Sequence, residues 1–538
     1  MLKLHSSAWW MAAASGVLQV VIFPTPDLHW LCWIAFAPLL AAVLRPRAAG
    51  SPHASADTWR PASPLQAFLL GWLAGFIWAI GSCYWIFSVM NGYGGLGAPV
   101  ALGVLVAFCV ILGGHTAVYT WLLSLLANGA RDPRAGLRRA LVLAPVFWVA
   151  MEYFRTAFTS FPWNLLGTVQ VNNISLTRVA TATGVYGISF EILLVNAGFA
   201  AAWVTRQRAR RVLLIASLVA TVALQASEFI PAPALPAPGT ALLVQPNLKL
   251  MQRWTAESFQ QMLDRLHAIS VPPPPAESLG DPLADLVVWP ESPAPFFVND
   301  EHFRNTISQI AMQSRAWVIT GSIGVAGPGT GLQPENIFNS ASLVAPNGVW
   351  TARYDKIHLV PFGEYVPYKS FFGFAHQLTR EVGDFVPGTR RNVFNLGRYK
   401  VGAFICYESI FPGEVREFAA HGAQVFVNIS DDEWFGHSAA PGQHLNQARM
   451  RAVENGRWLL RSTNTGLTVS IDPYGRVVER APRDVLTALH APFGVVTATT
   501  FYTRHGDWFC WLCVIISLVA LAASAPWQSL RRQPSARI

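Results

Sequence analysis

Eight long apolar runs dominate this 538-residue chain and limit what it can fold into. Hydrophobic residues make up 52% of it and charged residues only 13%, against about 25% charged residues in a typical soluble domain. This balance excludes a disordered chain and argues against an ordinary cytosolic enzyme. At about 20 residues per span, the sequence predicts eight transmembrane helices, the first of them uncleaved, at residues 8–23, 29–44, 65–88, 98–127, 139–155, 186–205, 212–226 and 508–525.

Arginine is concentrated in alternate connections between these runs, which predicts how the chain is oriented. Arginine-rich connections stay on the cytoplasmic side of a membrane, so both termini are expected to be cytoplasmic and the segment 227–507 periplasmic. The arginines also explain much of the net charge of +9 without any nucleic-acid partner. The arginine-rich connections are 45–60, 128–139, 206–211 and the C-terminal tail, whereas 24–28 and 89–97 contain no lysine or arginine.

The segment 227–507 has the pattern of a soluble α/β domain, because short β-rich runs alternate there with turns and helical patterns. We therefore expect a membrane domain of seven helices at 1–226, the α/β domain at 227–507, and an eighth helix with a cytoplasmic tail at 508–538. Strands are predicted at 241–245, 286–289, 317–323, 340–345, 399–406, 424–429 and 459–471, and helices at 255–270, 301–314, 412–420 and 442–456.

Six cysteines are present, and Cys406 alone falls in the segment 227–507. In an oxidising compartment it has no disulfide partner within that domain, so it is either a buried structural cysteine or a nucleophile. Cys510 and Cys513 form a C-x-x-C pair inside an apolar helix without nearby histidine or acidic ligands. We interpret this pair as packing residues and not as a redox or metal site.

Three polar groups stand where β-rich runs end: Glu291 in WPES, Lys356 in YDKIHLVPFGEYVP and Cys406 in CYES. Reactive groups converge at strand ends in open α/β architectures. A carboxylate can take the proton of a thiol as general base, and a fixed cation can stabilise a thiolate and the oxyanion of a tetrahedral intermediate. Each residue alone has an ordinary explanation, as a surface strand end, a solvated lysine or a buried cysteine. The combination favours nucleophilic catalysis.

These motifs resemble the three catalytic motifs of the nitrilase superfamily, and the whole chain resembles its membrane-bound branch, the apolipoprotein N-acyltransferase family. The resemblance implies a polytopic α-helical membrane domain plus an exported α/β nitrilase-like αββα sandwich domain. It also implies that Glu291 is the general base, that Lys356 stabilises the oxyanion and that Cys406 is the nucleophile. Other matching stretches are FPWNL at 161–165, VQPN at 244–247, QARMRA at 447–452 and RSTNTG at 461–466.

The same resemblance assigns supporting roles around these three residues. Glu364 matches a second carboxylate that supports the site, and Tyr407 and Glu408 match residues that flank the nucleophile. Trp254 resembles a substrate-binding tryptophan on a mobile arm near the substrate opening. The segment 371–388 corresponds to a flexible, lid-like stretch.

One stretch departs from the family pattern. The chain has Asp-Asp-Glu at 431–433 where the family usually has Asn-Asp followed by a variable residue. With His437 and His444 close in sequence, these acids invite a metal-site hypothesis, but the resemblance implies neither a metal nor any other cofactor. In the membrane part, Glu152 and Arg155 stand three residues apart and are expected to pair.

The function implied by the resemblance is acyl transfer. An acyl chain would move from a membrane phospholipid, through a Cys406 thioester, to the α-amine of the S-diacylglyceryl-cysteine that begins an apolipoprotein. The enzyme would act as a monomer in the bacterial inner membrane. Two alternatives stay open: a membrane-tethered nitrilase-type amidase acting on a small exported amide, and a transporter or scaffold without enzymatic activity.

Overall fold

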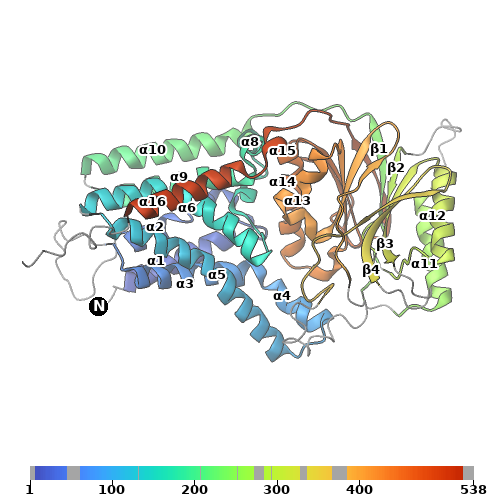
Figure 1. Cartoon of the computed structure of the whole chain (residues 1–538), viewed down its shortest axis with the longest axis horizontal. Coiled ribbons are helices and arrows are strands. Elements are labelled where there is room, and N and C mark those ends of the chain that lie inside the picture. The colour runs from blue at the N-terminus through green and yellow to red at the C-terminus, as the bar shows by residue number, and fades with distance from the viewer. Residues whose placement is uncertain are drawn as a thin grey trace, which may run out of the picture.

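Helices form both ends of the chain, and strands lie in its middle part (Figure 1). The computed structural model describes residues 6–44, 61–130, 132–205, 207–250, 253–271, 284–292, 294–326, 336–365 and 385–524. Several sequence predictions concern residues outside the described ones: the arginines at 45, 47, 60, 131 and 206, the C-terminal tail from 525, and residues 371–384 of the lid-like segment.

The apolar runs of the first 226 residues form a bundle of helices. Polar residues set the start of some of them. Asp132, for example, accepts the backbone N–H groups of Arg134 and Ala135, so that α6 begins at Pro133, where the fixed φ of proline suits a first helical turn. The elements are α1 (Ser6–Val21), η1 (His29–Trp33), α2 (Ala37–Leu44), α3 (Pro64–Cys83), α4 (Trp85–Ser88), η2 (Val89–Tyr93), α5 (Ala98–Asn128), α6 (Pro133–Thr159), η3 (Leu166–Gln170), α7 (Ile174–Thr177), α8 (Ala180–Thr183), α9 (Val185–Val204), α10 (Gln207–Ala226) and η4 (Ser227–Phe229).

The stretch 29–44, predicted as one helix, is broken in the structure into η1 and α2. Pro38 lacks a backbone N–H and cannot continue a helix that started earlier. The Asn196 side chain of α9 accepts the N–H groups of Phe36 and Ala37 at 2.8 and 3.0 Å. It therefore satisfies the donors that the break leaves open inside the bundle.

Five helical segments among the described residues are long and apolar enough to cross a membrane. The stretch 29–44 and α16 (Trp508–Ser524) are apolar but shorter, and α1 has 16 residues. A helical membrane domain is thus supported, whereas the predicted count of eight spans stays a prediction. The five segments are α3, α5, α6, α9 and Arg208–Phe229, which contains most of α10.

The middle of the chain folds into two six-stranded sheets with the orders β12-β1-β2-β3-β4-β5 and β11-β10-β9-β8-β7-β6. Strands β1, β2 and β3 are parallel, as are β7, β8 and β9. The strands are β1 (Gly239–Gln245), β2 (Leu286–Val288), β3 (Trp317–Ala326), β4 (Asn336–Val344), β5 (Trp350–Asp355), β6 (Val393–Asn395), β7 (Lys400–Ile405), β8 (Val425–Ser430), β9 (Trp458–Thr463), β10 (Val469–Ile471), β11 (Val477–Arg480) and β12 (Thr487–Phe493).

The two sheets pack face to face between two helical layers (Figure 1). On β1, Ala241 and Leu243 join the core between the sheets, while Leu242 and Val244 pack with the outer helices α11 and α12. This alternation follows from the two-residue period of a strand. The expected αββα sandwich is observed. Its helices are α11 (Ala256–Ser270), α12 (Glu301–Ser314), η7 (Cys406–Ile410), α13 (Pro412–Ala420), η8 (Asp432–Phe435), α14 (Ala440–Asn455) and α15 (Phe501–His505).

Figure 1 shows α13 and α14 between the second sheet and the membrane helices. Met450 and Val453 of α14 belong to the same buried apolar cluster as the membrane helices. The sandwich and the bundle therefore share a packed boundary through α14.

One predicted strand was wrong in detail. The run 459–471 is two antiparallel strands, β9 and β10. The chain reverses between them at Gly466, whose φ of +108° suits glycine. The sequence also missed β5, β6, β11 and β12, which are short or largely polar on one face.

Candidate active site

The ends of four strands bring the predicted site residues together. Glu291 follows β2, Lys356 follows β5, and Cys406 follows β7 directly. Asp431 follows β8, the parallel neighbour of β7. Since β2 and β5 belong to one sheet and β7 and β8 to the other, the site lies where both sheets end.

Glu291 is held by its backbone surroundings and by the opposite sheet. Its Oε2 accepts the backbone N–H of Asp431 at 2.9 Å. Beneath it, a Cβ at Gly321 of β3 would lie 2.2 Å from the Pro290 carbonyl oxygen. Only glycine allows this close approach, which seats the turn carrying Glu291 against β3.

Lys356 lies between two carboxylates and is only 1% exposed. Its Nζ is 3.2 Å from Glu291 Oε1 and 3.0 Å from Glu364 Oε1. Burial alone would lower the pKa of Lys356, but Glu291 and Glu364 outweigh burial and raise it. The lysine is therefore a permanent cation in the site.

Asn339 of β4 joins the two carboxylates and was missed by the sequence reasoning. Its Nδ2 donates to Glu291 Oε1 at 2.7 Å and to Glu364 Oε1 at 2.5 Å. The Asn339 carbonyl also accepts the backbone N–H of Lys356 at 2.8 Å. An asparagine at the start of a β-rich run was a weak signal, because the pairing of β4 with β5 had first to be known.

Cys406 opens the turn η7 with a φ of +47°. This left-handed conformation is costly for a residue with a side chain and persists where the surroundings enforce it. Burial, with Glu291 adding to it and Lys356 opposing it, raises the pKa of Cys406 well above its ordinary value. At rest the group is therefore a thiol, and it needs a base to become a nucleophile.

Glu408 connects the cysteine turn to the lysine strand. One carboxylate oxygen accepts the N–H of Ile405 at 2.8 Å. The other accepts the N–H of Ile357 at 2.7 Å and the Tyr354 hydroxyl at 2.7 Å. Because Glu408 is fully buried, it ties β5 and β7 together in the interior directly behind the site.

Two other predicted residues lie at the edges of this arrangement. The Tyr407 hydroxyl donates to the Ser160 carbonyl at 2.7 Å, which joins the cysteine turn to the segment after α6. Trp254 lies just before α11 and packs edge-on against Phe259 of that helix, with 6.1 Å between ring centroids. Among the described contacts, none joins Trp254 to Glu291, Lys356 or Cys406.

The acidic stretch 431–433 has separate partners instead of one shared metal site. Arg461 Nη2 donates to both oxygens of Asp432, at 2.9 and 2.8 Å. Asp431 Oδ1 accepts the Asn464 amide at 3.1 Å, and burial together with Glu291 raises the pKa of Asp431. Among the described residues, no group of three or more His, Cys, Asp or Glu side chains could hold a metal ion.

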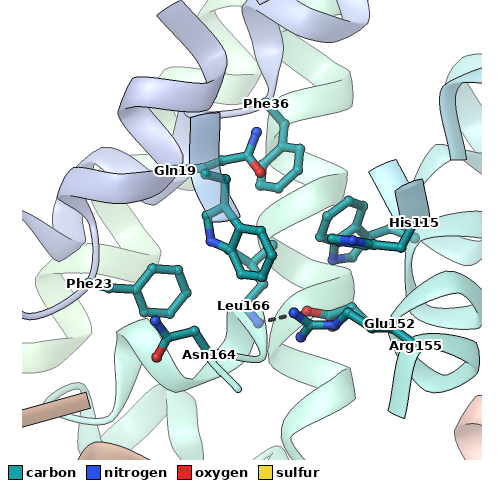
Figure 2. Close-up of a pocket in the computed structure, with 10 residues that line it drawn as sticks. Gln19, Phe23, Phe36, His115, Glu152, Arg155, Asn164 and Leu166 are labelled. Carbon is teal, nitrogen blue, oxygen red and sulfur yellow. Dashed lines mark hydrogen bonds between the residues drawn. The ribbon is translucent and has the colours of Figure 1, made fainter. Parts of the chain in front are cut away.

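A small cavity lies within the membrane bundle, lined by polar side chains of α1, α5 and α6 (Figure 2). The expected ion pair between Glu152 and Arg155 is not among the described ion pairs. Instead, Glu152 accepts the backbone N–H of Leu166 at 2.7 Å, and the Arg155 guanidinium lies over the Trp78 ring at 5.0 Å. Glu152 thus anchors the segment that follows α6, which faces the α/β domain.

The geometry fits a thiol nucleophile served by a carboxylate and a fixed cation. Glu291 can take a proton, Lys356 can stabilise negative charge, and Asn339 with Glu364 holds both in place. Lys356 contacts both Glu291 and Glu364, and Cys406 lies close enough for the charges of Glu291 and Lys356 to act on its pKa. Glu408 ties the cysteine turn to the lysine strand, Tyr407 borders the site, and Trp254 contacts none of these residues in the described part of the chain.

Comparison with known proteins covers both parts of the chain. Residues 237–499 match the carbon-nitrogen hydrolase family, and residues 15–198 match the apolipoprotein N-acyltransferase N-terminal domain. The apolipoprotein N-acyltransferase of Geobacter metallireducens is 34% identical over 97% of this chain and 96% of that protein. The one of Methylococcus capsulatus is 31% identical over 88% of this chain and 90% of that protein.

Solved structures were matched as well. An amidase from Nesterenkonia sp. is 22% identical, with a TM-score of 0.36, over 51% of this chain and 95% of that chain.

Proposed function

The chain belongs to the apolipoprotein N-acyltransferase family and is an acyltransferase, and on that premise we propose that it transfers an acyl chain from a membrane phospholipid to an apolipoprotein. The acceptor is the α-amine of the N-terminal S-diacylglyceryl-cysteine. The reaction runs through a thioester on Cys406, with Glu291 as general base and Lys356 as oxyanion stabiliser. No metal or cofactor takes part.

In the first half-reaction, the Cys406 thiol passes its proton to Glu291 and attacks the carbonyl carbon of a phospholipid ester. The resulting oxyanion is stabilised by the Lys356 ammonium. When the tetrahedral intermediate collapses, the ester C–O bond breaks and the lysophospholipid alkoxide takes the proton from Glu291. A thioester remains on the enzyme.

In the second half-reaction, the acceptor amine attacks the thioester carbonyl and gives a proton to Glu291. The C–S bond then breaks, the Cys406 sulfur regains the proton, and the amine has become an amide. One carboxylate thus serves as base and then as acid in each half-reaction.

The observation that carries this proposal is the buried cluster of Glu291, Lys356 and Glu364 beside Cys406. Lys356 is buried between Glu291 and Glu364, and the raised pKa of Cys406 makes a neighbouring base necessary. The bond from Tyr407 to Ser160 joins the cysteine turn to the membrane part, on whose side both substrates would carry their acyl chains.

We further propose the topology that such substrates require. The protein lies in the bacterial inner membrane as a monomer, with both termini cytoplasmic and residues 227–507 periplasmic. In support, the end of α9 and the start of α10 lie at the side of the bundle farthest from the sheets (Figure 1), and the first turns of α10 carry Arg208, Arg210 and Arg211.

The test is transfer by the purified full chain in detergent–phospholipid micelles, using a synthetic diacylglyceryl-cysteine peptide as acceptor. We expect the peptide to gain one acyl mass, parallel double-reciprocal lines for the two substrates, and no transfer by Cys406→Ala. Release of free fatty acid without acylated peptide would overturn the proposal. The membrane-tethered amidase is not favoured, because the relatives named acyltransferases match the membrane part as well.

A further inference from the structure

His444 of α14 is a fully buried histidine that contacts the backbone of the cysteine turn. Its Nε2 lies 3.0 Å from the Cys406 carbonyl oxygen and 2.8 Å from Ser409 Oγ. A carbonyl oxygen can only accept, so Nε2 must carry the hydrogen for the bond to Cys406 to exist.

The other ring nitrogen faces a buried ion pair. Arg461 Nη2 is 3.1 Å from Nδ1 of His444 and bonds both oxygens of Asp432. Burial, and then the charge of Arg461, lowers the pKa of His444 below its ordinary value, so the ring is neutral near pH 7. In a neutral ring with Nε2–H donating to Cys406, Nδ1 can accept from Arg461. Asp432 Oδ1 also lies 3.2 Å from Nδ1 and takes its own hydrogen bonds from Arg461 and Ser430.

The flat faces of His444 meet the membrane part of the chain. The Trp163 ring, from the segment after α6, stacks on it with 5.7 Å between centroids and 27° between planes. Trp163 Nε1 is itself fixed by a 2.6 Å bond to Gln443 Oε1. The ring is therefore held by Arg461 from the sandwich and by Trp163 from the bundle.

We propose that His444 is a positioning residue for the Cys406 nucleophile and that Trp163, from the membrane part, holds the His444 ring in place. Cys406 has a φ of +47°, a conformation that needs external restraint. His444 supplies this restraint at the Cys406 carbonyl. The neighbouring Tyr407–Ser160 bond adds a second tie to the bundle. Residues of the membrane part therefore help to hold the proposed active site in its working geometry. This inference rests on the proposed role of Cys406.

The test uses the full-length enzyme in phospholipid micelles and compares His444→Leu with His444→Gln, which keeps an N–H donor. The first readout is the rate of Cys406 acylation by phospholipid without acceptor, followed by intact mass. The second is the apparent KM for phospholipid, and the third is the unfolding midpoint. Loss of one buried hydrogen bond to a strained backbone predicts acylation slowed about 5- to 100-fold in His444→Leu, with KM unchanged. His444→Gln should recover most of the rate.

Trp163→Ala gives an independent arm, because Trp163 does not bond Cys406 in the described structure. We expect slower acylation there too, with less effect in Trp163→Phe. The control is His115→Gln, a buried histidine of α5 whose ring bonds the Leu112 carbonyl; its acylation rate should match that of the wild type.

Two outcomes would overturn the inference. One is wild-type acylation in His444→Leu. The other is a loss of rate that follows the unfolding midpoint in every variant, His115→Gln included. Failure of the proposed function has a different signature: wild-type protein that gains no acyl mass at all.

Discussion

Replacing Lys356 by methionine tests the electrostatics of the site most severely. Methionine keeps an unbranched side chain that is one atom shorter, but the charge that sits 3.2 Å from Glu291 and 3.0 Å from Glu364 is lost. Removing one partner of a buried ion pair costs about 3–5 kcal/mol. Losing the group that stabilises an oxyanion costs roughly 10²- to 10³-fold in rate. We therefore expect both stability and activity to fall.

The loss of stability should depend on pH. Without the lysine, Glu291 and Glu364 face each other across Asn339, and like charges raise the pKa of one of them in the folded state. A folded-state pKa above the unfolded value of about 4.3 makes the variant lose stability as pH rises through that window. The difference in stability between the variant and the wild type should be small near pH 4.5 and reach its full size at pH 7.5.

The assay is the apparent unfolding midpoint in detergent at both pH values, together with the acyl-transfer rate. Lys400→Met, which removes the charge of an exposed lysine at the start of β7, is the matched control and should change neither. The double variant Lys356→Met/Glu364→Gln removes one of the opposed carboxylates. It should regain much of the stability but none of the activity. A Lys356→Met protein as stable and active as the control would refute the reasoning.

Three further predictions follow from single contacts. Glu408→Gln replaces a carboxylate that accepts several N–H groups by an amide, and should lower the acylation rate at least about tenfold, measured by intact mass. Gly321→Ala places a Cβ 2.2 Å from the Pro290 carbonyl and should reduce transfer by displacing the turn of the proposed base, whereas unchanged kinetics would argue against this contact. Burial alone would raise the pKa of Asp432, but Arg461 and His444 together outweigh burial and hold the pKa below the ordinary value. These contacts should therefore stabilise the protein above about pH 4 and be lost on further acidification; Asp432→Asn should flatten the acid limb of an unfolding-midpoint titration.

Much of the α/β domain could be predicted from local pattern. The run before Cys406 is apolar, β-rich and ends in polar residues, so both the strand β7 and the position of the cysteine at its end were predictable. The same holds for β2 and Glu291. Helices α11 to α14 carry amphipathic patterns and were placed within two residues of their bounds.

Contacts between distant segments could not be predicted in this way. Asn339 reaches Glu291 and Lys356 because β4 pairs with β3 on one side and with β5 on the other, and no property of its own sequence neighbourhood shows those pairings. His444 and Asp432 invited a metal hypothesis because they are close in sequence. In the structure, Arg461 of β9 instead pairs its charge with that of Asp432. The break at 29–44 depended on Pro38 and on a cap from Asn196, 160 residues after Phe36.

The most direct test of the central claim is to locate the acyl group on the enzyme. Purified full-length protein is incubated with phospholipid and no acceptor, and its intact mass and proteolytic fragments are compared with those of Cys406→Ala. The account predicts one added acyl mass, found on the fragment that contains Cys406, absent from the variant, and discharged by a diacylglyceryl-cysteine peptide. An acyl group on another residue, or equal transfer by Cys406→Ala, would contradict it.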